Sequence, residues 1–456
     1  MYRCTARRAV IPAFASALAL FGVATWGCAE RAQPPSAPAN VVLITLDTTR
    51  VDRLGLYGHT RATSPTLDVL GTESQVFDNA YSTSSWTLPA HASLFTGMLP
   101  TSHGADKDPE GALVLSNAVV TPDTWKIYRA NAPREDVPTL AELLKGAGYA
   151  TGAVVGGPWM KRVFGLGRGF DYYDDENVVA DGRPGSELTE RARAWLRTQK
   201  TPFLLFLNYF DPHTPYTAPD TYLKKVLGKE TFSKDATADE IRLLRYDAEI
   251  RFTDDQIGLL FFELRRLGLY DSSWIVVTAD HGELFGEHDR SGHGITLDQE
   301  IVHVPLIVKP PLGVGKPGRR DEWVQLTDVM PLLLDALHLP LPASAQGSVP
   351  GKDRSHPIFA EVRLLPAESD AGGYRAIIED GWKLISSSRG ERALFDLAQD
   401  PRESRDLSKV DTERLTRMTA QLESFVAALP RAPPPGPARS LDPETVDALR
   451  GLGYVK

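Results

Sequence analysis

The chain has 456 residues, an ordinary content of hydrophobic and charged residues, and a formal net charge of -9 at pH 7. A chain of this length can bury a full hydrophobic core in one large domain or two, and its composition is that of a folded globular protein. The negative charge, with no run of Lys or Arg, argues against a nucleic-acid-binding protein. The two cysteines, Cys4 and Cys28, lie near the N-terminus, which excludes a disulfide framework in the body of the chain.

The first 28 residues have the pattern of an export signal. Three arginines in MYRCTARR precede the apolar run AVIPAFASALALFGVATWG, and Cys28 stands just before the Pro-rich spacer 29–39. This order is similar to a bacterial lipoprotein signal, in which Cys28 would be lipidated and would attach the protein to a membrane. We therefore expect an exported protein, periplasmic or on the outer surface. A cleaved signal without lipid stays open as an alternative, and Pro12 and the short apolar run disfavour a single N-terminal membrane anchor.

Apolar, β-branched runs alternate with helical patterns from residue 40 to residue 310. Strands are predicted at 41–47, 150–156, 202–211, 272–280 and 304–309, and helices at 63–73, 137–148, 186–199 and 237–268. Runs that are apolar on both faces are typical of buried strands in a mainly parallel sheet with helices on either side. In the last helix, one core-facing stripe is predicted from the helical spacing of Ile241, Leu244, Ile250, Ile257 and Leu260. The pattern predicts an α/β domain over residues 40–343.

The pattern changes after residue 343. Short strands are predicted at 356–362, 373–380, 381–388 and 393–397, followed by one helix over 411–428. Short apolar runs separated by turn residues are typical of an antiparallel sheet. Residues 344–456 are therefore predicted to form a small second subdomain and an extended, Pro-rich tail.

Three of the predicted strands end in an acid, a histidine or both. Asp47 ends the first strand, Asp280 and His281 end the fourth, and Asp211 with His213 ends the third. In an open α/β sheet, ligands bind beyond the carboxyl ends of the strands, so these side chains are expected at one edge. A buried cluster of acids and histidines is costly unless a cation neutralises it.

We interpret this convergence as a site for one divalent metal ion. Oxygen and imidazole ligands suit Mn, Mg or Zn, and Ca where carboxylates dominate. A single Asp at a strand end would more simply be a turn residue or the cap of the next helix. The hypothesis therefore depends on all of these strand ends meeting.

The stretch SSWTLPAHASLFTG, residues 84–97, places the three hydroxyls of Ser84, Ser85 and Thr87 before a predicted helix. They could cap the helix by accepting hydrogen bonds from its free N–H groups. Alternatively, one of them is a nucleophile, since a helix N-terminus suits a phosphate or sulfate and a hydroxyl beside a metal ion can ionise near neutral pH. The residue pattern by itself does not choose between capping and catalysis.

Segments from residue 40 to the C-terminus follow, in order, the motifs of one known family. TLPAH (87–91) with Thr96 and Gly97 fits the motif Cys-x-Pro-Ser/Ala-Arg-x4-Thr-Gly in the spacing of its first residue, its Pro and its Thr-Gly pair. Other similar segments are LITLDTTRVDRLGLYG (43–58), NYFDPHTPY (208–216), TADHGELFGEH (278–288) and LFDLAQDPRESRDL (394–407). The chain thus resembles the sulfatase family within the alkaline-phosphatase-like superfamily.

The resemblance implies the sulfatase-like α/β fold, a large mainly parallel sheet flanked by helices with a small C-terminal antiparallel sheet, and an ester hydrolase. It makes Thr87 the nucleophile. The metal ligands that it implies are Asp47, Thr87, Asp280 and His281. It suggests His213 and His293 as contacts to the ester oxygens or the leaving group, and it puts His91, as a substrate contact, where the family has its motif Arg.

This sequence departs from the family pattern at several positions. Thr48 stands where the family has a second Asp, and no Lys occurs in 282–300, where one is expected. Thr87 replaces the Cys or Ser that sulfatases convert to formylglycine, and its extra methyl group would leave a ketone at best, so no formylglycine is expected. The loop 105–136 is longer than in the family, and is predicted to be either a specificity lid or surface decoration.

A Thr nucleophile is typical of the phosphate-ester branches of the superfamily, such as enzymes similar to lipoteichoic-acid synthases and phosphoethanolamine transferases. Those transferases usually have several membrane helices, which this sequence lacks. We therefore expect a metal-dependent hydrolase of phosphate or sulfate esters, with phosphorus esters favoured, acting on a small-molecule, lipid or glycan ester. The alternatives are a phosphoryl-group transferase acting on an envelope lipid or glycan, and a catalytically inactive sulfatase-like binding protein.

Overall fold

The computed structural model describes residues 39–115, 129–200, 202–228, 235–352, 356–365 and 372–433. The predicted export signal (1–28), nearly all of the spacer 29–39 and the tail beyond residue 433 lie outside these ranges and stay predictions. Within the described ranges, no helix combines the length and the apolar character that crossing a membrane requires.

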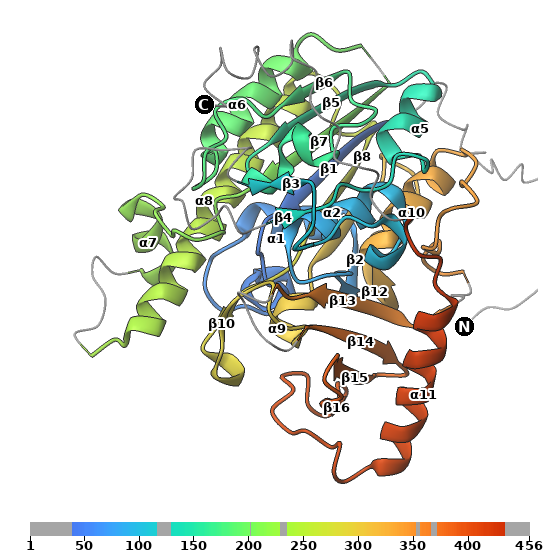
Figure 1. Cartoon of the computed structure of the whole chain (residues 1–456). Helices are drawn as coiled ribbons and strands as arrows, with labels where there is room; N and C mark the ends of the chain where they lie inside the picture. Colours follow the sequence, from blue (N-terminus) through green and yellow to red (C-terminus); the bar gives the residue numbers. More distant parts are fainter. Residues whose placement is uncertain are drawn as a thin grey trace, which may run out of the picture. The chain divides into compact units, whose positions relative to one another are not determined.

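One eight-stranded sheet forms the centre of the fold, with the strand order β12-β2-β11-β8-β1-β7-β5-β6 (Figure 1). In that order the strands span Gly318–Gln325, Gln75–Tyr81, Leu306–Lys309, Ser273–Ala279, Asn40–Leu46, Phe203–Tyr209, Ala150–Val155 and Tyr172–Asp174. All five strands predicted from the sequence lie in it, which confirms the α/β prediction. The sequence pattern missed β2, β6 and β12, because β6 is three residues long, β2 has half-exposed positions among its buried ones, and most of β12 is exposed or half-exposed.

The sheet is mixed but mostly parallel. Strands β8, β1, β7, β5 and β6 run parallel, and β11 is antiparallel to both of its neighbours, β8 and β2. In the parallel register, Leu46 of β1 pairs with Tyr209 of β7 on one side and with Ala279 of β8 on the other. The residues that follow these three strands therefore leave the sheet side by side.

Helices cover both faces of the sheet (Figure 1). Phe203 and Phe206, three positions apart on β7, face opposite sides of the sheet. Trp195 packs on Phe203 with ring centroids 5.8 Å apart, and Phe95 packs on Phe206 at 4.8 Å. Trp195 belongs to α6 and Phe95 to α2, so these two helices lie on different faces.

The helices of the main domain agree with the sequence prediction to within a few residues at each end. The predicted ones are α1 (Pro65–Gly71), α2 (Thr87–Thr96), α5 (Leu140–Gly146), α6 (Gly185–Leu196) and α8 (Ala238–Arg266), and the others are α3 (Pro100–His103), α7 (Asp220–Leu227), α9 (Gln299–Val302) and α10 (Val329–Ala336). Helix α8 begins at a capping box formed by Thr237 and Glu240. Of its predicted stripe, Ile250, Ile257 and Leu260 are buried, whereas Ile241 and Leu244 are half-buried.

The C-terminal part is the predicted four-stranded antiparallel sheet. Its strands, in order, are β13 (Ile358–Arg363), β14 (Gly373–Glu379), β15 (Trp382–Ser387) and β16 (Arg392–Asp396), and the helix α11 (Thr412–Ala428) packs on it. Apolar side chains of the sheet and of α11, among them Phe359, Ile377 and Leu422, form a second core.

This small sheet is bonded to the segments around helix α2. The N–H of Glu361 donates to the Thr83 carbonyl at 3.0 Å. The Glu361 carboxylate accepts from the N–H of Thr101 at 2.5 Å and from its hydroxyl at 2.8 Å. One buried acid of β13 thus holds the chain after α2 in place.

Replacing Glu361 by Ala is expected to lower the free energy of unfolding by about 2 kcal/mol, because two half-buried donors of Thr101 would lose their charged acceptor. The melting temperature, followed by circular dichroism, measures the effect. Glu391→Ala is the control in the turn between β15 and β16, since Glu391 is exposed and such changes stay within about 0.5 kcal/mol. Equal melting temperatures for the two variants would contradict the prediction.

Candidate active site

The ends of β1 and β8 bring three acidic and imidazole side chains together. Oxygen or nitrogen atoms of Asp47, Asp280 and His281 all lie within 4.8 Å of one another, and all three residues are buried. These are three of the four ligands that the sequence predicted. Asp211, which follows β7, lies elsewhere: its carboxylate accepts from the N–H of Gly185, the first residue of α6, at 2.7 Å.

In each carboxylate of this cluster, one oxygen accepts hydrogen bonds from the protein. Asp47 Oδ2 accepts from the Asn208 side chain at 3.3 Å, and Asp280 Oδ1 accepts from the N–H groups of Thr48 (3.2 Å) and His281 (2.9 Å). The other oxygen of each, Asp47 Oδ1 and Asp280 Oδ2, is buried without a hydrogen-bond partner among the described residues. Two such oxygens beside an imidazole are a donor set that fits a divalent cation.

The pKa shifts of the two carboxyl groups also favour a bound cation. Burial raises the pKa of Asp280 to about 6. Burial, and then the charge of Asp280, raises the pKa of Asp47 well above its usual value. The N–H at Nδ1 of His281 donates to the Gly282 carbonyl at 2.9 Å, which leaves Nε2 as the nitrogen able to ligate. A cation held here would offset a negative charge that the protein itself leaves poorly compensated.

A second group, His288, Asp298 and Glu403, has similar spacing. Its charges are already compensated by the protein: Lys383 lies 2.7 Å from Glu403, and Arg290 lies 3.4 Å from Asp298. Its carboxylates therefore need no cation, and the cluster of Asp47, Asp280 and His281 is the candidate metal centre.

Thr87 lies beside this cluster, at the first position of α2. Its Oγ1 is 3.5 Å from Nε2 of His281, and the residue is 4% exposed. The cap position belongs to Trp86, without a side-chain capping bond, and the hydroxyls of Ser84 and Ser85 have no hydrogen-bond partner in the described part of the chain. None of the three hydroxyls therefore caps α2, and capping does not explain them.

The turn after β1 has a strained backbone at Thr48, next to the cluster. Thr48 has a φ of 52°, in the left-handed region, which is unusual for a β-branched residue. Its N–H reaches Asp280 at 3.2 Å, and its carbonyl accepts from the Tyr246 hydroxyl at 2.7 Å. That hydroxyl in turn accepts from the N–H of Arg50 at 2.8 Å. Bonds on both sides thus hold Thr48 in a conformation that aims a backbone donor at Asp280.

His91 is enclosed by the protein next to the cluster. It is completely buried, its Nδ1 donates to the Thr87 carbonyl at 2.8 Å, and its Nε2 lies 2.9 Å from the Thr45 hydroxyl. Its Nδ1 is also 3.7 Å from Asp280. With both ring nitrogens on protein atoms, His91 occupies a different place from the substrate contact that the sequence predicted.

His293 lies next to His281, and His213 lies next to His293. The ring of His293 lies 4.6 Å from that of His281 and 5.0 Å from that of His213, and both residues are partly exposed. Nδ1 of His293 donates to the carboxylate of Glu283 at 3.2 Å, and the Tyr216 hydroxyl donates to the same carboxylate at 3.3 Å. The structure therefore gathers both predicted histidines at the edge of the cluster.

Asn208 is a site residue that the sequence analysis missed. Its Oδ1 accepts from the N–H groups of Gly156 (3.3 Å) and Gly157 (2.9 Å), which turns its Nδ2 toward Asp47. The signal was present in the sequence, since Asn208 is the polar residue inside the apolar strand β7. Buried polar side chains are hydrogen-bonded, so an Asn in such a strand indicates a fixed partner.

Lys107 is a second residue that the sequence analysis missed. Its ammonium donates to the Gly294 carbonyl at 3.2 Å and lies 5.4 Å from the ring centroid of Trp86. Burial lowers the pKa of His293 to about 4, and the positive charge of Lys107 contributes to that shift. No local motif marks Lys107, because it comes from the long loop that begins at residue 105.

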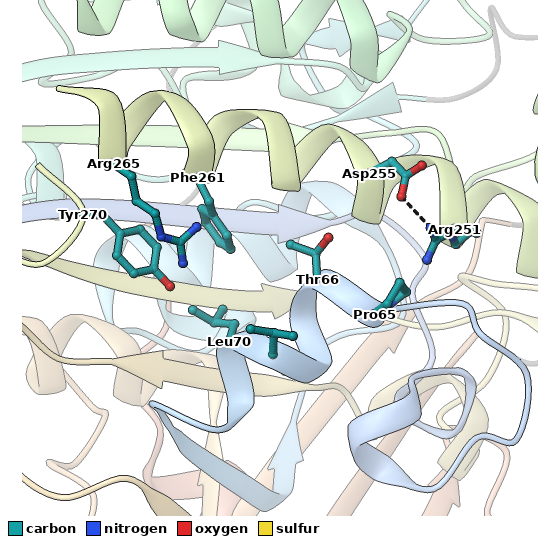
Figure 2. Close-up of a pocket in the computed structure, with 9 residues that line it drawn as sticks. Pro65, Thr66, Leu70, Arg251, Asp255, Phe261, Arg265 and Tyr270 are labelled. Carbon is teal, nitrogen blue, oxygen red and sulfur yellow. Dashed lines mark ion pairs between the residues drawn. The ribbon is translucent and has the colours of Figure 1, made fainter. Parts of the chain in front are cut away.

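A separate pocket of about 290 Å³ lies between α1 and α8 (Figure 2). Its lining includes Arg251, which pairs with Asp255 at 2.8 Å, and Arg265, whose guanidinium stacks 3.7 Å from the Tyr270 ring centroid. None of its lining residues belongs to the cluster around Asp47. The pocket therefore does not take part in the chemistry of the cluster.

Comparisons with known proteins give the family of this chain. The sulfatase family model matches residues 39–339, which is more than half of the chain. The ulvan-active sulfatase of Formosa agariphila is 26% identical over 433 residues, covering 88% of this chain and 83% of that protein.

Solved structures share the fold. The structure of a protein in complex with its substrate D-glucosamine-2-N,6-O-disulfate has a TM-score of 0.68 at 18% identity, over 86% of this chain and 97% of the other. The phosphonate monoester hydrolase of Agrobacterium radiobacter has a TM-score of 0.64 at 19% identity, over 85% and 95%. The strand ends, the buried cluster and the family match together show that this chain belongs to the sulfatase family, whose members are metal-dependent ester hydrolases.

Proposed function

We propose that this enzyme hydrolyses phosphorus esters, either phosphate mono- or diesters or phosphonates, with Thr87 as the nucleophile. The observation that supports this most directly is the position of the Thr87 hydroxyl. It lies at the start of α2, 3.5 Å from Nε2 of His281, in the cluster whose two carboxylates each have an oxygen without a hydrogen-bond partner among the described residues.

Asp47, Asp280, His281 and Thr87 would hold one divalent ion. The ion would lower the pKa of the Thr87 hydroxyl and draw negative charge from the ester oxygens. His91 would position these ligands, since it bonds the Thr87 carbonyl and lies 3.7 Å from Asp280.

The reaction then needs one nucleophile and one proton donor. Thr87 gives up its hydroxyl proton to solvent, Oγ1 attacks phosphorus as an alkoxide, and the bond to the leaving-group oxygen breaks as protonated His293 donates its proton to that oxygen. Water then attacks the phosphorus of the Thr87 ester as His293 takes a proton from the water, and the bond from phosphorus to Thr87 breaks, which releases the phosphorus product and restores the Thr87 alkoxide and protonated His293. Glu283 orients His293 through its bond to Nδ1 and stabilises the charged ring, and His213 contacts the ester oxygens.

The choice of phosphorus over sulfur rests on the chemistry of Thr87. A Thr side chain cannot give the aldehyde of formylglycine, so the covalent intermediate must be an ester that attack by water cleaves. A structural neighbour with this fold is a phosphonate monoester hydrolase. Hydrolysis of a sulfate ester on a glycan is the second candidate, because one relative is an ulvan-active sulfatase and one neighbour holds a sulfated glucosamine.

Thr87→Ala is expected to lower kcat/KM by about 10⁴-fold or more on the best ester, the usual cost of removing a nucleophile. Thr87→Ser, which keeps the hydroxyl, is expected to remain active. The assay compares an aryl phosphate monoester, phosphate diester, phosphonate and sulfate, each with Mn, Mg, Zn or Ca. Turnover of the sulfate with little turnover of phosphorus esters would refute the phosphorus assignment, and undiminished activity of Thr87→Ala would refute the nucleophile.

Asp280→Asn is expected to abolish stabilisation by the divalent ion. At a free metal concentration 100 times Kd, binding raises the free energy of unfolding by about 2.7 kcal/mol, and the variant should lack the matching rise in melting temperature. Asp298→Asn, in the second acidic group, is the control and should keep the rise. The prediction fails if both variants respond to metal like the wild type.

His293→Gln is expected to slow hydrolysis by about 100-fold for an alkyl ester and much less for a 4-nitrophenyl ester, since a poor leaving group needs the proton and a good one does not. A plot of log kcat/KM against the pKa of the leaving group should therefore become steeper in the variant. An equal loss for every leaving group would rule out His293 as the general acid.

A further inference from the structure

With a divalent ion bound, the proposed metal centre has no net positive charge. It therefore does not attract an anionic ester. The two carboxylates of Asp47 and Asp280 offset the two charges of a divalent ion, and the carboxylate of Glu283 lies close by, bonded to His293. An ester that carries one or two negative charges therefore needs a cation from the protein.

Arg50, although its guanidinium reaches the Glu283 carbonyl at 3.2 Å, is committed elsewhere. It forms ion pairs of 2.7 Å with both Asp52 and Glu287. Two acids thus compensate its charge, which removes it as the partner of a bound anion.

Lys107 lies between the two catalytic segments. Its ammonium donates to the carbonyl of Gly294, the residue after His293, and lies over the ring of Trp86, the residue before Thr87. The Lys107 ammonium therefore lies next to both the residue before the nucleophile and the residue after His293.

The backbone around Lys107 is fixed. Lys107 pairs with Ala130 in an antiparallel bridge, and its carbonyl accepts from Arg363 of the C-terminal sheet at 3.4 Å. Gly294 has a φ of +74°, and a Cβ atom added there would lie 3.2 Å from the Lys107 nitrogen. A glycine at 294 thus allows the close approach of the ammonium to the His293 loop.

We propose that Lys107 binds a charged oxygen of the ester group and makes the enzyme prefer phosphate monoesters, which carry two negative charges, over diesters and sulfates, which carry one. This proposal rests on the proposed function and adds the substrate class. A fixed ammonium attracts a dianion more strongly than a monoanion at the same distance. Lys107 is thereby a specificity-determining residue that comes from the long loop.

The test compares Lys107→Met with Lys309→Met. Lys309 is a matched control, because it is also buried, its ammonium also donates to a backbone carbonyl (Tyr270, 2.6 Å), and it also lies over an aromatic ring (4.5 Å), but in β11. Both full-length variants are assayed with a phosphate monoester, a methyl phosphate diester and a sulfate that share one aryl leaving group. The pH is kept above 7, where the monoester is a dianion.

Lys107→Met is expected to lower kcat/KM for the monoester by about 10- to 100-fold, the effect of losing one charged hydrogen bond, and to lower the diester and sulfate values clearly less. Lys107→Arg should restore part of the preference, and Lys309→Met should leave the ratio between substrates unchanged. An equal loss of kcat/KM on all three esters would show that Lys107 only holds the His293 loop in place, and would overturn the proposal.

Calorimetric binding of inorganic phosphate to the metal-loaded full chain separates this proposal from the proposed function. Phosphate should bind Lys107→Met more weakly than the wild type by a factor similar to the loss on the monoester. If the wild type hydrolyses no ester, the proposed function fails and phosphate binding alone decides on Lys107. If the wild type turns over phosphorus esters but Lys107→Met keeps both the substrate ratio and the phosphate affinity, or if phosphate does not bind the wild type, the Lys107 proposal alone is wrong.

Discussion

Two buried carboxylates, Asp47 and Asp280, are the constraint on which the rest of the site depends. They are adjacent because β1 and β8 are parallel neighbours that end at the same level, with Leu46 paired to Ala279. Each keeps one oxygen bonded to the protein and one without a hydrogen-bond partner among the described residues. Burying two such charges is unfavourable without a cation. The stability of the fold around them therefore depends on whether a cation binds there.

Three neighbouring residues fix the cluster and Thr87 through hydrogen bonds. Asn208, fixed by two glycine N–H groups, bonds Asp47 from β7. Thr48, in a left-handed conformation, bonds Asp280 through its backbone. His91 joins the Thr87 carbonyl to the Thr45 hydroxyl next to the cluster. Backbone strain and buried polar side chains are concentrated where the proposed chemistry needs fixed positions.

The C-terminal sheet contributes to the site although none of the predicted site residues belongs to it. Glu361 bonds Thr83 and Thr101 on either side of α2, and Arg363 bonds the carbonyl of Lys107. Glu403 accepts from the N–H of Gln299 at 2.8 Å, at the end of the loop that holds His293. The C-terminal part of the chain, through the small sheet and Glu403 after it, therefore fixes three segments that border the cluster: the nucleophile helix, the start of the long loop and the His293 loop.

The sequence by itself determined the elements and the chemistry of their ends. Continuous apolar runs identified the five central strands, helical spacing identified α8, and the residues that follow those strands supplied Asp47, Asp280, His281 and His213. These features are local, so a pattern of a few residues is enough to predict them. The strands β2 and β12 were missed because neither has a continuous apolar run, and pairing with other strands in the sheet is what makes them strands.

Only the tertiary structure decided which residues meet. It separated Asp211, whose carboxylate accepts from the first N–H of α6, from Asp47 and Asp280. It also placed His91 next to the nucleophile, with both ring nitrogens hydrogen-bonded to the protein. It also brought Lys107 to Gly294, 187 positions along the chain. A contact of that sequence separation leaves no periodic signal in either segment, because it depends on how the sheet, the long loop and the C-terminal strands pack together.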